Sequence, residues 1–484
     1  MVPEFWIHLG AAWQWFLVGL EMAALTVGLA HVTLRQRDSR AAAFWAVIII
    51  FVPLLGAAFY SVFGINRLRR TVKKYRSGME SHKTVVGEAV PANPWEKFPE
   101  ISGLRRLAAT LGRLSRYEFT VGNKVVIYRT GDEAMSEMLK AIKSAKRSIT
   151  LCSYIFEAKG IGQKFVDELV AAKLRGVEVR VMVDDAGTRY SWPPVTRILA
   201  KRGINVARFM PHRFVLRLLT MNLRNHRKIL VVDGCVGFTG GMNIRQGNML
   251  LENPKSPVLD MHFRVEGPVV RQFQRAFAED WAYCAREVLA GDLWYPEIQP
   301  CGNVAAIGVP DGPDEDLEVM PKAIFAAINS ARSEIRVMTP YFLPDPQIQW
   351  ALNLACLRGV DVRIVTPRAN NIPPVRWAAR TLYPDMLERG VRIFECEGLF
   401  DHSKFMTVDR TWSLIGSTNW DPRSLRLNFE FNVACFDDAL AGDLNAEFEK
   451  KIAISEEVTL EELRSASLPE RMRDGLARMF IPVL

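Results

Sequence analysis

Two long apolar runs near the start of the chain predict a membrane hairpin. Residues 41–64 are 24 consecutive positions without a charged side chain, and a helix of that length crosses the hydrocarbon core of a bilayer. The earlier run, about residues 12–32, is apolar except for Glu21 near its middle and His31 near its end. A cleaved signal peptide is the alternative, but a second apolar run follows the first at once. We therefore expect a two-helix transmembrane hairpin.

Beyond residue 100, the apolar positions recur first at helical spacing and then at strand spacing. Helical spacing is found at 134–145 and 163–175, and a short β-branched run follows each segment, at 149–155 and 177–183. This alternation is typical of α/β units with a largely parallel sheet.

The α/β region repeats itself in the same order. AIKSAKRSI (141–149) returns as AINSARSEI (327–335), and NHRKILVVD (225–233) returns as DHSKFMTVD (401–409). The offset between the copies shortens along the chain, which indicates an insertion in the first copy near 211–221. We therefore expect a duplicated α/β fold whose two halves form one composite site.

These patterns divide the chain into five parts. They are a transmembrane hairpin with a basic juxtamembrane segment (1–76), a linker (77–100), a first half (101–290), a second half (300–455) and a C-terminal amphipathic helical tail (456–484). The tail contains a capping-box pattern from Thr459 to Glu462, followed by apolar residues on one helical face. It either lies on a membrane surface or packs against the catalytic halves.

Composition and charge narrow the class of protein. The chain has 484 residues, of which 49% are hydrophobic, and a net charge of +9. This excludes a disordered or fibrous chain, and the positive charge indicates an anionic partner, either nucleic acid or anionic lipid. The seven cysteines form no CxxC pair, so we expect neither a disulfide framework nor a structural zinc site.

The distribution of basic residues predicts the orientation in the membrane. Six cations and no acid follow the second apolar run, at Arg67, Arg69, Arg70, Lys73, Lys74 and Arg76. Because the larger basic cluster stays in the cytoplasm, we expect the α/β halves on the cytoplasmic side. The same cluster either attracts anionic headgroups as well or acts as a topology signal only.

Each half contains the pattern His-x-Lys-x4-Asp, which is suited to phosphate chemistry. Its members are His226, Lys228 and Asp233 in the first half, and His402, Lys404 and Asp409 in the second. On a strand, the His and the Lys share one face, which places an imidazole that can attack phosphorus beside a cation that neutralises its oxygens. The two aspartates fall on the opposite strand face, and we interpret them as structural members of the candidate catalytic set.

Two further pairs of residues belong to the candidate site. Asn243 and Asn419 each follow the histidine of their half by 17 positions, after small residues that let a phosphate approach closely. Asp260 and Glu430 each open a strand-like segment downstream of the histidine in their own half. A catalytic imidazole needs an acceptor that fixes its tautomer, so we expect each acid to orient the histidine of its own half.

The paired motifs, together with GGMN (240–243), GSTN (416–419) and TPYFLPD (339–345), resemble the phospholipase D superfamily. The order of two apolar runs, a basic stretch and two such halves is similar to membrane-anchored bacterial cardiolipin synthases. The resemblance implies an enzyme of the bacterial inner membrane that needs no metal or other cofactor. Its implied partners are phosphatidylglycerol and anionic membrane lipid, with no nucleic acid.

The resemblance also implies a two-step transesterification. His226 would attack the phosphorus of one phosphatidylglycerol while protonated His402 donates to the departing glycerol. A second phosphatidylglycerol would then attack the phosphatidyl-histidine and form cardiolipin, with His402 acting as the base. The phosphoryl oxygens would be held by Lys228, Lys404, Asn243 and Asn419.

Other functions remain open from the sequence alone. A hydrolase of the same superfamily would use water in the second step, and another phosphatidyl donor or acceptor would give a different lipid. A membrane-tethered nuclease or nucleic-acid binder fits the charge but gives no reason for two apolar runs. A non-catalytic scaffold would tolerate loss of a motif His or Lys, yet all four are present. The segment 211–221 mixes Arg with bulky apolar residues, and it either dips into the membrane interface or is buried.

Overall fold

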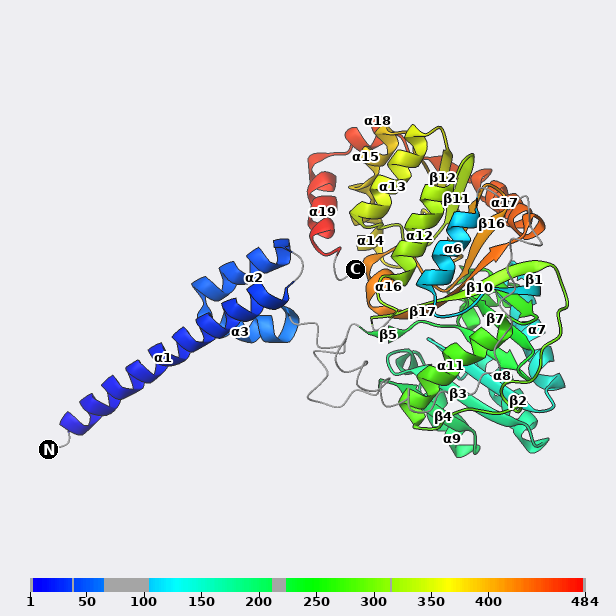
Figure 1. Ribbon diagram of the computed structural model, residues 1–484, viewed down its shortest axis with the longest axis horizontal. Coiled ribbons are helices and arrows are strands. Elements are labelled where there is room, and N and C mark those ends of the chain that lie inside the picture. The colour runs from blue at the N-terminus through cyan, green and yellow to red at the C-terminus, as the bar shows by residue number, and fades with distance from the viewer. Residues whose placement is uncertain (1–2, 37–38, 65–103, 211–222, 314–315, 482–484) are drawn as a thin grey trace. The chain divides into compact units, whose positions relative to one another are not determined.

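The computed structural model describes residues 3–36, 39–64, 104–210, 223–313 and 316–481 (Figure 1). They belong to two compact units, an N-terminal helical unit and an α/β unit. The predicted linker (77–100), the basic cluster (67–76) and the segment 211–221 lie outside the described residues.

The described part of the N-terminal unit contains four helical segments: α1 (Pro3–Arg35), α2 (Ser39–Phe51), α3 (Pro53–Phe59) and a π-helical turn, η1 (Tyr60–Gly64). Within α1, the stretch Trp13–Arg35 is long and apolar enough to cross a membrane. The second apolar run, which we expected to form a single span, is broken between α2 and α3. Pro53 explains the break, because a proline disfavours helical backbone at the preceding residue, and Val52 has φ −140° and ψ 73°.

The helices of this unit pack against one another. Val32, Ile49 and Tyr60 are buried between them, and the hydroxyl of Tyr60 lies 2.9 Å from Nδ1 of His31. Many outward-facing side chains are large and apolar, among them Trp15, Phe16, Phe44, Phe51 and Leu55. A helical hairpin with an apolar outer surface is the form expected in a lipid environment.

Among the described residues, one 16-stranded sheet runs through both halves of the α/β unit (Figure 1). Its strands follow the order β18-β13-β12-β11-β15-β16-β17-β10-β1-β9-β7-β6-β2-β3-β4, and the remaining strand, β5, pairs with β17 off this path. The strands of the first half are β1 (Thr120–Tyr128), β2 (Ser148–Ser153), β3 (Glu178–Asp184), β4 (Asn205–Phe209), β5 (Arg224–Asn225), β6 (Ile229–Val232), β7 (Val236–Gly240), β8 (Val258–Leu259) and β9 (His262–Glu266). Those of the second half are β10 (Val304–Asp311), β11 (Glu334–Met338), β12 (Asp361–Pro367), β13 (Arg392–Cys396), β14 (Phe400–Asp401), β15 (Phe405–Val408), β16 (Trp412–Gly416) and β17 (Asn428–Phe436), with β18 (Ser455–Glu457) at the edge.

The two halves meet where β1 pairs antiparallel with β10, with Thr120 opposite Ala306. Outward from this pair, equivalent strands follow in the same order on both sides, which confirms the duplicated α/β fold. Our expectation of a largely parallel sheet was wrong. Along the strand order given above, only β2-β3-β4 and β11-β12-β13 are parallel. Short turns join β6 to β7 and β15 to β16, and strands joined in this way can only pair antiparallel.

Helices pack on the sheet and bury the core. Those of the first half are α6 (Arg105–Leu114), α7 (Gly131–Ser144), α8 (Ile161–Leu174), α9 (Val195–Lys201) and α11 (Val270–Ala285). Those of the second are α12 (Val319–Ser330), α13 (Pro346–Leu357), α14 (Pro373–Arg380), α15 (Tyr383–Glu388), α16 (Pro422–Arg426) and α17 (Asp438–Ile452). Phe273, Phe277 and Trp281 of α11 are fully buried. Helix α6 contacts α12, so the start of the predicted first half packs against the second.

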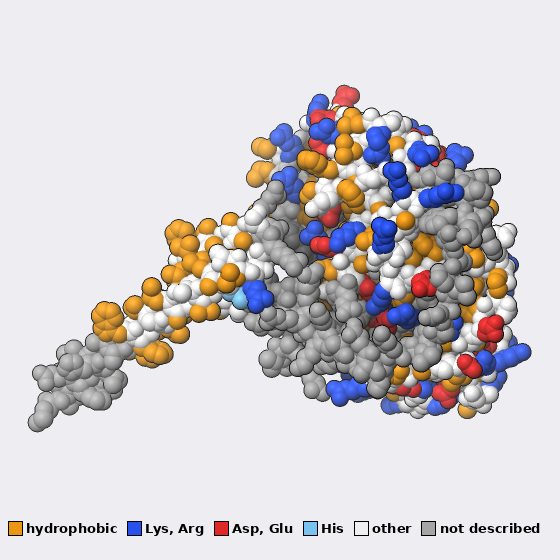
Figure 2. All heavy atoms as spheres, in the orientation of Figure 1, with side chains coloured by type: hydrophobic (Ala, Val, Ile, Leu, Met, Phe, Trp, Pro, Cys, Tyr) orange, Lys and Arg blue, Asp and Glu red, His pale blue; other side chains and the backbone are white. Residues whose placement is uncertain are grey.

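The C-terminal tail forms α18 (Leu460–Arg464) and α19 (Leu468–Met479). Thr459 caps α18 by accepting a hydrogen bond from the Glu462 backbone at 3.1 Å, as the capping-box pattern predicts. Helix α19 contacts α14, and Arg473 lies over the ring of Trp377. An apolar stripe of α19 nevertheless stays exposed, at Leu468, Met472, Leu476, Met479 and Phe480. Figure 2 shows hydrophobic and basic side chains gathered over this part of the α/β unit.

Candidate active site

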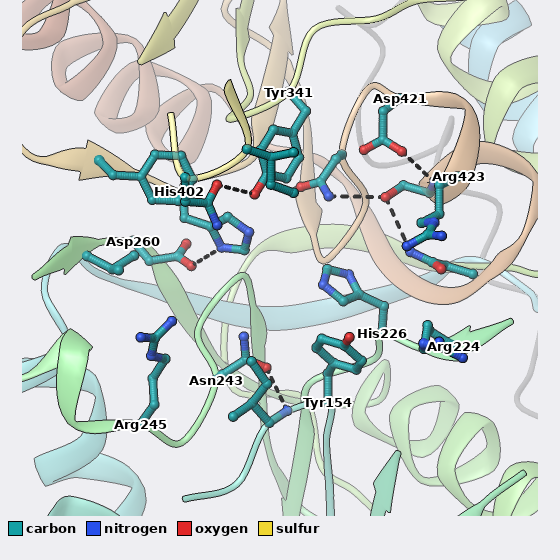
Figure 3. A pocket seen from close by; sticks show the side chains of 18 of the residues that line it. Tyr154, Arg224, His226, Asn243, Arg245, Asp260, Tyr341, His402, Asp421 and Arg423 are labelled. Atoms are coloured by element: carbon teal, nitrogen blue, oxygen red, sulfur yellow. Dashed lines mark hydrogen bonds and ion pairs between the residues drawn. The ribbon is translucent and has the colours of Figure 1, made fainter. Parts of the chain in front are cut away.

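A cavity of about 340 Å³ contains both motif histidines (Figure 3). Its lining combines residues of the two halves and includes five of the predicted site residues, His226, Asn243, Asp260, His402 and Asn419. The ring centroids of His226 and His402 are 6.5 Å apart, and the ring planes are nearly perpendicular at 85°. The structure therefore brings the two motifs together in one site.

The motif histidines and lysines lie just before β6 and β15, not within them as the pattern predicted. The backbone of each motif pairs with the other half instead. The His226 amide donates to the Phe429 carbonyl at 2.9 Å, and the His402 amide donates to the Leu259 carbonyl at 2.7 Å. Because of this exchange, β5 pairs with β17 and β14 pairs with β8.

The orienting acids are exchanged between the halves as well. Glu430 of the second half contacts Nδ1 of His226 at 2.9 Å, and Asp260 of the first half contacts Nδ1 of His402 at 2.8 Å. Our expectation that each acid orients the histidine of its own half was therefore wrong. The reason is that each acid directly follows the residue whose carbonyl accepts a hydrogen bond from the backbone amide of the other half's motif histidine. Its side chain therefore lies beside that histidine.

The motif lysines are buried beneath the imidazoles. Lys228 Nζ donates to the His226 carbonyl at 2.7 Å, and Lys404 Nζ lies 2.8 Å from Nδ1 of His402. Burial lowers the pKa of Lys228 to about 7, although the negative charge of Glu430 acts to raise it. Burial likewise lowers the pKa of Lys404 to about 8, although the negative charge of Asp260 acts to raise it.

The motif aspartates occupy turns outside the cavity lining. Asp233 has φ +51°, and its carboxylate accepts hydrogen bonds from the backbone N–H groups of Arg147 at 2.7 Å and Ser148 at 3.0 Å. Asp409 has φ +52° and accepts from the corresponding backbone of residues 332–334. Each carboxylate thus ties the turn after the motif strand to the start of a neighbouring strand.

The two asparagines line the cavity but make different contacts. Asn243 Oδ1 accepts from the backbone of Ile155 at 3.1 Å, which leaves its amide nitrogen toward the histidines (Figure 3). Asn419 Nδ2 donates to the Ser424 hydroxyl at 3.1 Å.

The two histidine–acid pairs differ in their electrostatics. Burial raises the pKa of Asp260 to about 7, and the charge of Lys404 opposes this effect. Burial also acts to raise the pKa of Glu430, but this pKa lies below its ordinary value. It is lowered by the charge and hydrogen bond of His226, by the charge of Lys228 and by a hydrogen bond from Ser417. Ser417 Oγ donates to Glu430 Oε2 at 2.5 Å, whereas Gly241 stands at the equivalent position beside Asp260.

Burial lowers the pKa of both imidazoles, and that of His402 falls well below its ordinary value because Lys404 and other cations lie nearby. At neutral pH the Glu430 carboxylate is ionised beside a neutral His226. Because burial raises the pKa of Asp260 to about 7, the Asp260–His402 pair instead can take up a proton near neutral pH.

Several lining residues were not predicted from the sequence. Tyr154 packs against His226, with ring centroids 5.2 Å apart, and Tyr341 packs against His402 at 6.1 Å. Tyr154 is the first residue after β2 and Tyr341 is the third after β11, so the two tyrosines do not occupy equivalent places in the repeat. Three arginines also line the cavity, at Arg224, Arg245 and Arg423. Among the described residues, no cluster of three or more His, Cys, Asp or Glu side chains suits a metal ion.

Known proteins resemble this chain over nearly its whole length. The cardiolipin synthase, PLD-like domain family matches residues 138–281 and 324–452, and the phospholipase D-nuclease N-terminal family matches residues 23–64. The cardiolipin synthase of Oceanobacillus iheyensis is 30% identical, over 97% of this chain and 99% of that protein. Cardiolipin synthase A of Pseudomonas aeruginosa (strain LESB58) is 32% identical, over 97% of this chain and 95% of that protein.

A solved structure shares the fold. The phosphatidylserine synthase of Haemophilus influenzae Rd KW20 superposes with a TM-score of 0.57 at 16% sequence identity, covering 78% of this chain and 100% of that one.

Proposed function

The chain belongs to the family of cardiolipin synthases with phospholipase D-like domains, and from this premise we propose the substrates and chemical steps of its reaction. It is a phosphatidyltransferase that forms cardiolipin. We propose that both substrates are phosphatidylglycerol and that the second product is glycerol. The observation that supports this proposal best is the pair of opposed imidazoles, each beside its own buried lysine and carboxylate.

In the proposed first step, His226 is the nucleophile. Glu430 accepts a hydrogen bond from Nδ1–H of His226, so the free electron pair lies on Nε2. The Nε2–phosphorus bond forms while the bond from phosphorus to the glycerol oxygen breaks, and His402 donates a proton to that oxygen. Lys228 and Lys404 stabilise the charge on the non-bridging oxygens, and the amide of Asn243 is placed to donate to one of them.

In the proposed second step, a hydroxyl of the second phosphatidylglycerol replaces the departed glycerol. His402, now neutral, accepts the hydroxyl proton while the new oxygen–phosphorus bond forms and the bond to His226 breaks. The products are cardiolipin and a free His226, and His402 is protonated again for the next cycle. The Asp260–His402 pair suits this role because its proton is exchangeable near neutral pH.

We propose that the protein spans the bacterial inner membrane twice, with the catalytic halves at the cytoplasmic leaflet. The apolar α1 and the shorter helices α2 and α3 support a hairpin anchor. The exposed apolar stripe of α19 supports a second contact with the bilayer, since Arg471 and Arg478 flank it and bilayer-bound helices combine an apolar face with cations. Helix α14, against which α19 packs, contributes Val375 to the cavity lining, so this contact would hold the cavity near its lipid substrates.

The proposed reaction is tested by supplying the purified full-length protein with radiolabelled phosphatidylglycerol alone. We expect cardiolipin and glycerol in equal amounts, and we expect no product from His226→Ala. Phosphatidic acid as the main product would show that water is the acceptor and would contradict the proposed acceptor.

The covalent intermediate needs a separate experiment. A phosphatidyl ester with a good leaving group, such as p-nitrophenol, does not need the acid in the first step. With this substrate, His402→Ala should accumulate label on His226, which peptide mass spectrometry would locate. Label on any other residue would contradict His226 as the nucleophile.

A further inference from the structure

The cavity carries its positive charge unevenly around the two histidines. Arg245 follows Asn243 by two positions, and the residue at the same offset from Asn419 is Asp421. Both side chains line the cavity. Asp421 is committed to capping α16, because its carboxylate accepts from the Ser424 backbone at 2.8 Å. The duplication therefore places a cation at one end of the cavity and a structural carboxylate at the equivalent place in the other half.

Arg245 lies on the His402 side of the cavity. The segment that carries it passes against Asp260, the partner of His402, because the Gly241 amide donates to the Met261 carbonyl at 3.2 Å. The approach is so close that a Cβ at Gly241 would lie 2.3 Å from Asp260 Oδ1. The charge of Arg245 is also among those that lower the pKa of His402. Figure 3 shows Arg245 and Arg224 on opposite sides of His226.

The guanidinium of Arg245 is only weakly engaged by protein groups. Its ion pair with Glu157 has a long N–O distance of 3.8 Å, while the other oxygen of Glu157 accepts from the Gln246 backbone at 2.9 Å. Within the part of the chain that the structure describes, the buried Nε of Arg245 has no hydrogen-bond partner. A buried donor without a partner is costly, and an anionic ligand would remove that cost.

The two-step reaction fixes the side on which the acceptor binds. Attack by His226 expels glycerol from the opposite face of phosphorus, as in-line displacement requires. The second step must displace His226, so the acceptor hydroxyl enters along the path by which glycerol left, beside His402. An acceptor phosphatidylglycerol also carries a phosphodiester of its own, and this anion must lie farther along the same side.

We propose that Arg245 forms a binding site for the phosphodiester of the acceptor lipid, separate from the two lysines that hold the reacting phosphoryl group. This inference rests on the proposed function, since it assumes a double displacement with phosphatidylglycerol as acceptor. Arginine suits the role because its planar guanidinium binds two oxygens of one phosphate. The site would favour a lipid acceptor over water or a simple alcohol, which lack the second anion.

The test compares two acceptors in one reaction. Full-length protein in detergent micelles receives labelled phosphatidylglycerol together with 1-butanol, and the ratio of cardiolipin to phosphatidylbutanol is measured. Arg245→Gln should lower this ratio roughly 10-fold to 100-fold, the loss expected for a charged hydrogen bond, while butanol transfer continues. Arg245→Lys should lower it less. The matched control is Arg224→Gln, a change of another cavity arginine, which should leave the ratio unchanged.

A second arm removes the acyl chains from the comparison. Glycerophosphoglycerol and glycerol are offered as soluble acceptors, and Arg245→Gln should abolish the preference for the former. An unchanged ratio in Arg245→Gln, or a larger drop in Arg224→Gln, would overturn the assignment. Wild-type protein that forms phosphatidylbutanol but no cardiolipin would instead overturn the proposed acceptor itself.

Discussion

Glu430 lies 2.9 Å from Nδ1 of His226, although the two residues belong to different halves of the duplicated fold. Asp260 makes the reciprocal contact with His402. Each histidine therefore depends on the other half for the carboxylate that fixes its tautomer. This exchange assigns each acid to one chemical step, because His226 and His402 have different proposed roles.

Glu430→Gln and Asp260→Asn should respond differently to the leaving group. With phosphatidyl-p-nitrophenol, release of the leaving group needs no acid, so label should reach His226 in Asp260→Asn at close to the wild-type rate. Glu430→Gln impairs the nucleophile itself and should stay slower by about 100-fold or more. Rapid-quench measurement of the labelled protein distinguishes the two. The opposite pattern would mean that each acid serves the histidine of its own half.

Ser417→Ala should move the acidic limb of the pH profile upward. The Ser417 hydroxyl stabilises ionised Glu430, so its loss raises the pKa of Glu430. Activity that needs the carboxylate is lost as the pH falls through this pKa, and the loss then begins at a higher pH, by about one unit for a hydrogen bond of this kind. The profile of kcat/KM reports the change. Ser413→Ala in β16, which lies outside the cavity lining, is the control and should leave the limb in place.

Lys228→Arg should move the alkaline limb upward. Lys228 and Lys404 have pKa values of about 7 and about 8, and a lysine that must be protonated loses its function as the pH rises through its pKa. Arginine stays charged throughout, so with phosphatidyl-p-nitrophenol, whose release does not need the proton of the Asp260–His402 pair, only the limb of Lys404 should remain. The rate itself should fall, since arginine does not reproduce the lysine geometry. An alkaline limb that stays at about pH 7 would mean that another group causes it.

Asp233→Ala should cost stability and leave the chemistry intact. The carboxylate binds backbone N–H groups at the start of β2 and does not line the cavity. We expect a loss of about 1–3 kcal/mol in the free energy of unfolding, with kcat per folded molecule unchanged. Thermal unfolding in detergent and active-site titration measure the two quantities. Asp167→Ala removes an exposed ion pair with Arg202 and an exposed hydrogen bond from Gln163, and it should cost less than about 1 kcal/mol.

Replacing Leu476 and Met479 with Asp should weaken contact between α19 and the bilayer. The double variant should lose activity several-fold on phosphatidylglycerol vesicles, because its cavity is held less often at the surface. Activity in detergent micelles should stay the same. Leu174→Asp, at an exposed leucine on α8, is the matched control. Equal losses in vesicles and micelles would show that the stripe stabilises the fold instead.

The repeat was enough to predict the duplicated fold and the paired histidines and asparagines of the composite cavity. His226, His402, Asn243 and Asn419 recur at fixed offsets, and local repetition of that kind is visible in one sequence. The exchange of Asp260 and Glu430 was not predictable, because it depends on how β5 meets β17 and β14 meets β8. Those pairings join residues about 140 to 200 positions apart, with no local pattern to indicate them.

The break in the second apolar run was missed for a different reason. Pro53 stands within the run, and a proline there signals an interruption of the helix. The hydropathy of 41–64 outweighed that signal in our prediction. Arg245, by contrast, is an ordinary arginine in the sequence, and only its place in the cavity distinguishes it.

The central pairing of β1 with β10 also has a bearing on ancestry. A fragment ending in the connection between α11 and β10 would hold His226 without Glu430, and the complementary fragment would hold His402 without Asp260. Neither piece could carry out half of the reaction, so the enzyme cannot be divided into a donor module and an acceptor module. An ancestor with a single half would have needed two copies associated along the strand equivalent to β1. In a single chain, by contrast, one histidine–acid pair can differ from the other, as it does here with Gly241 beside Asp260 and Ser417 beside Glu430.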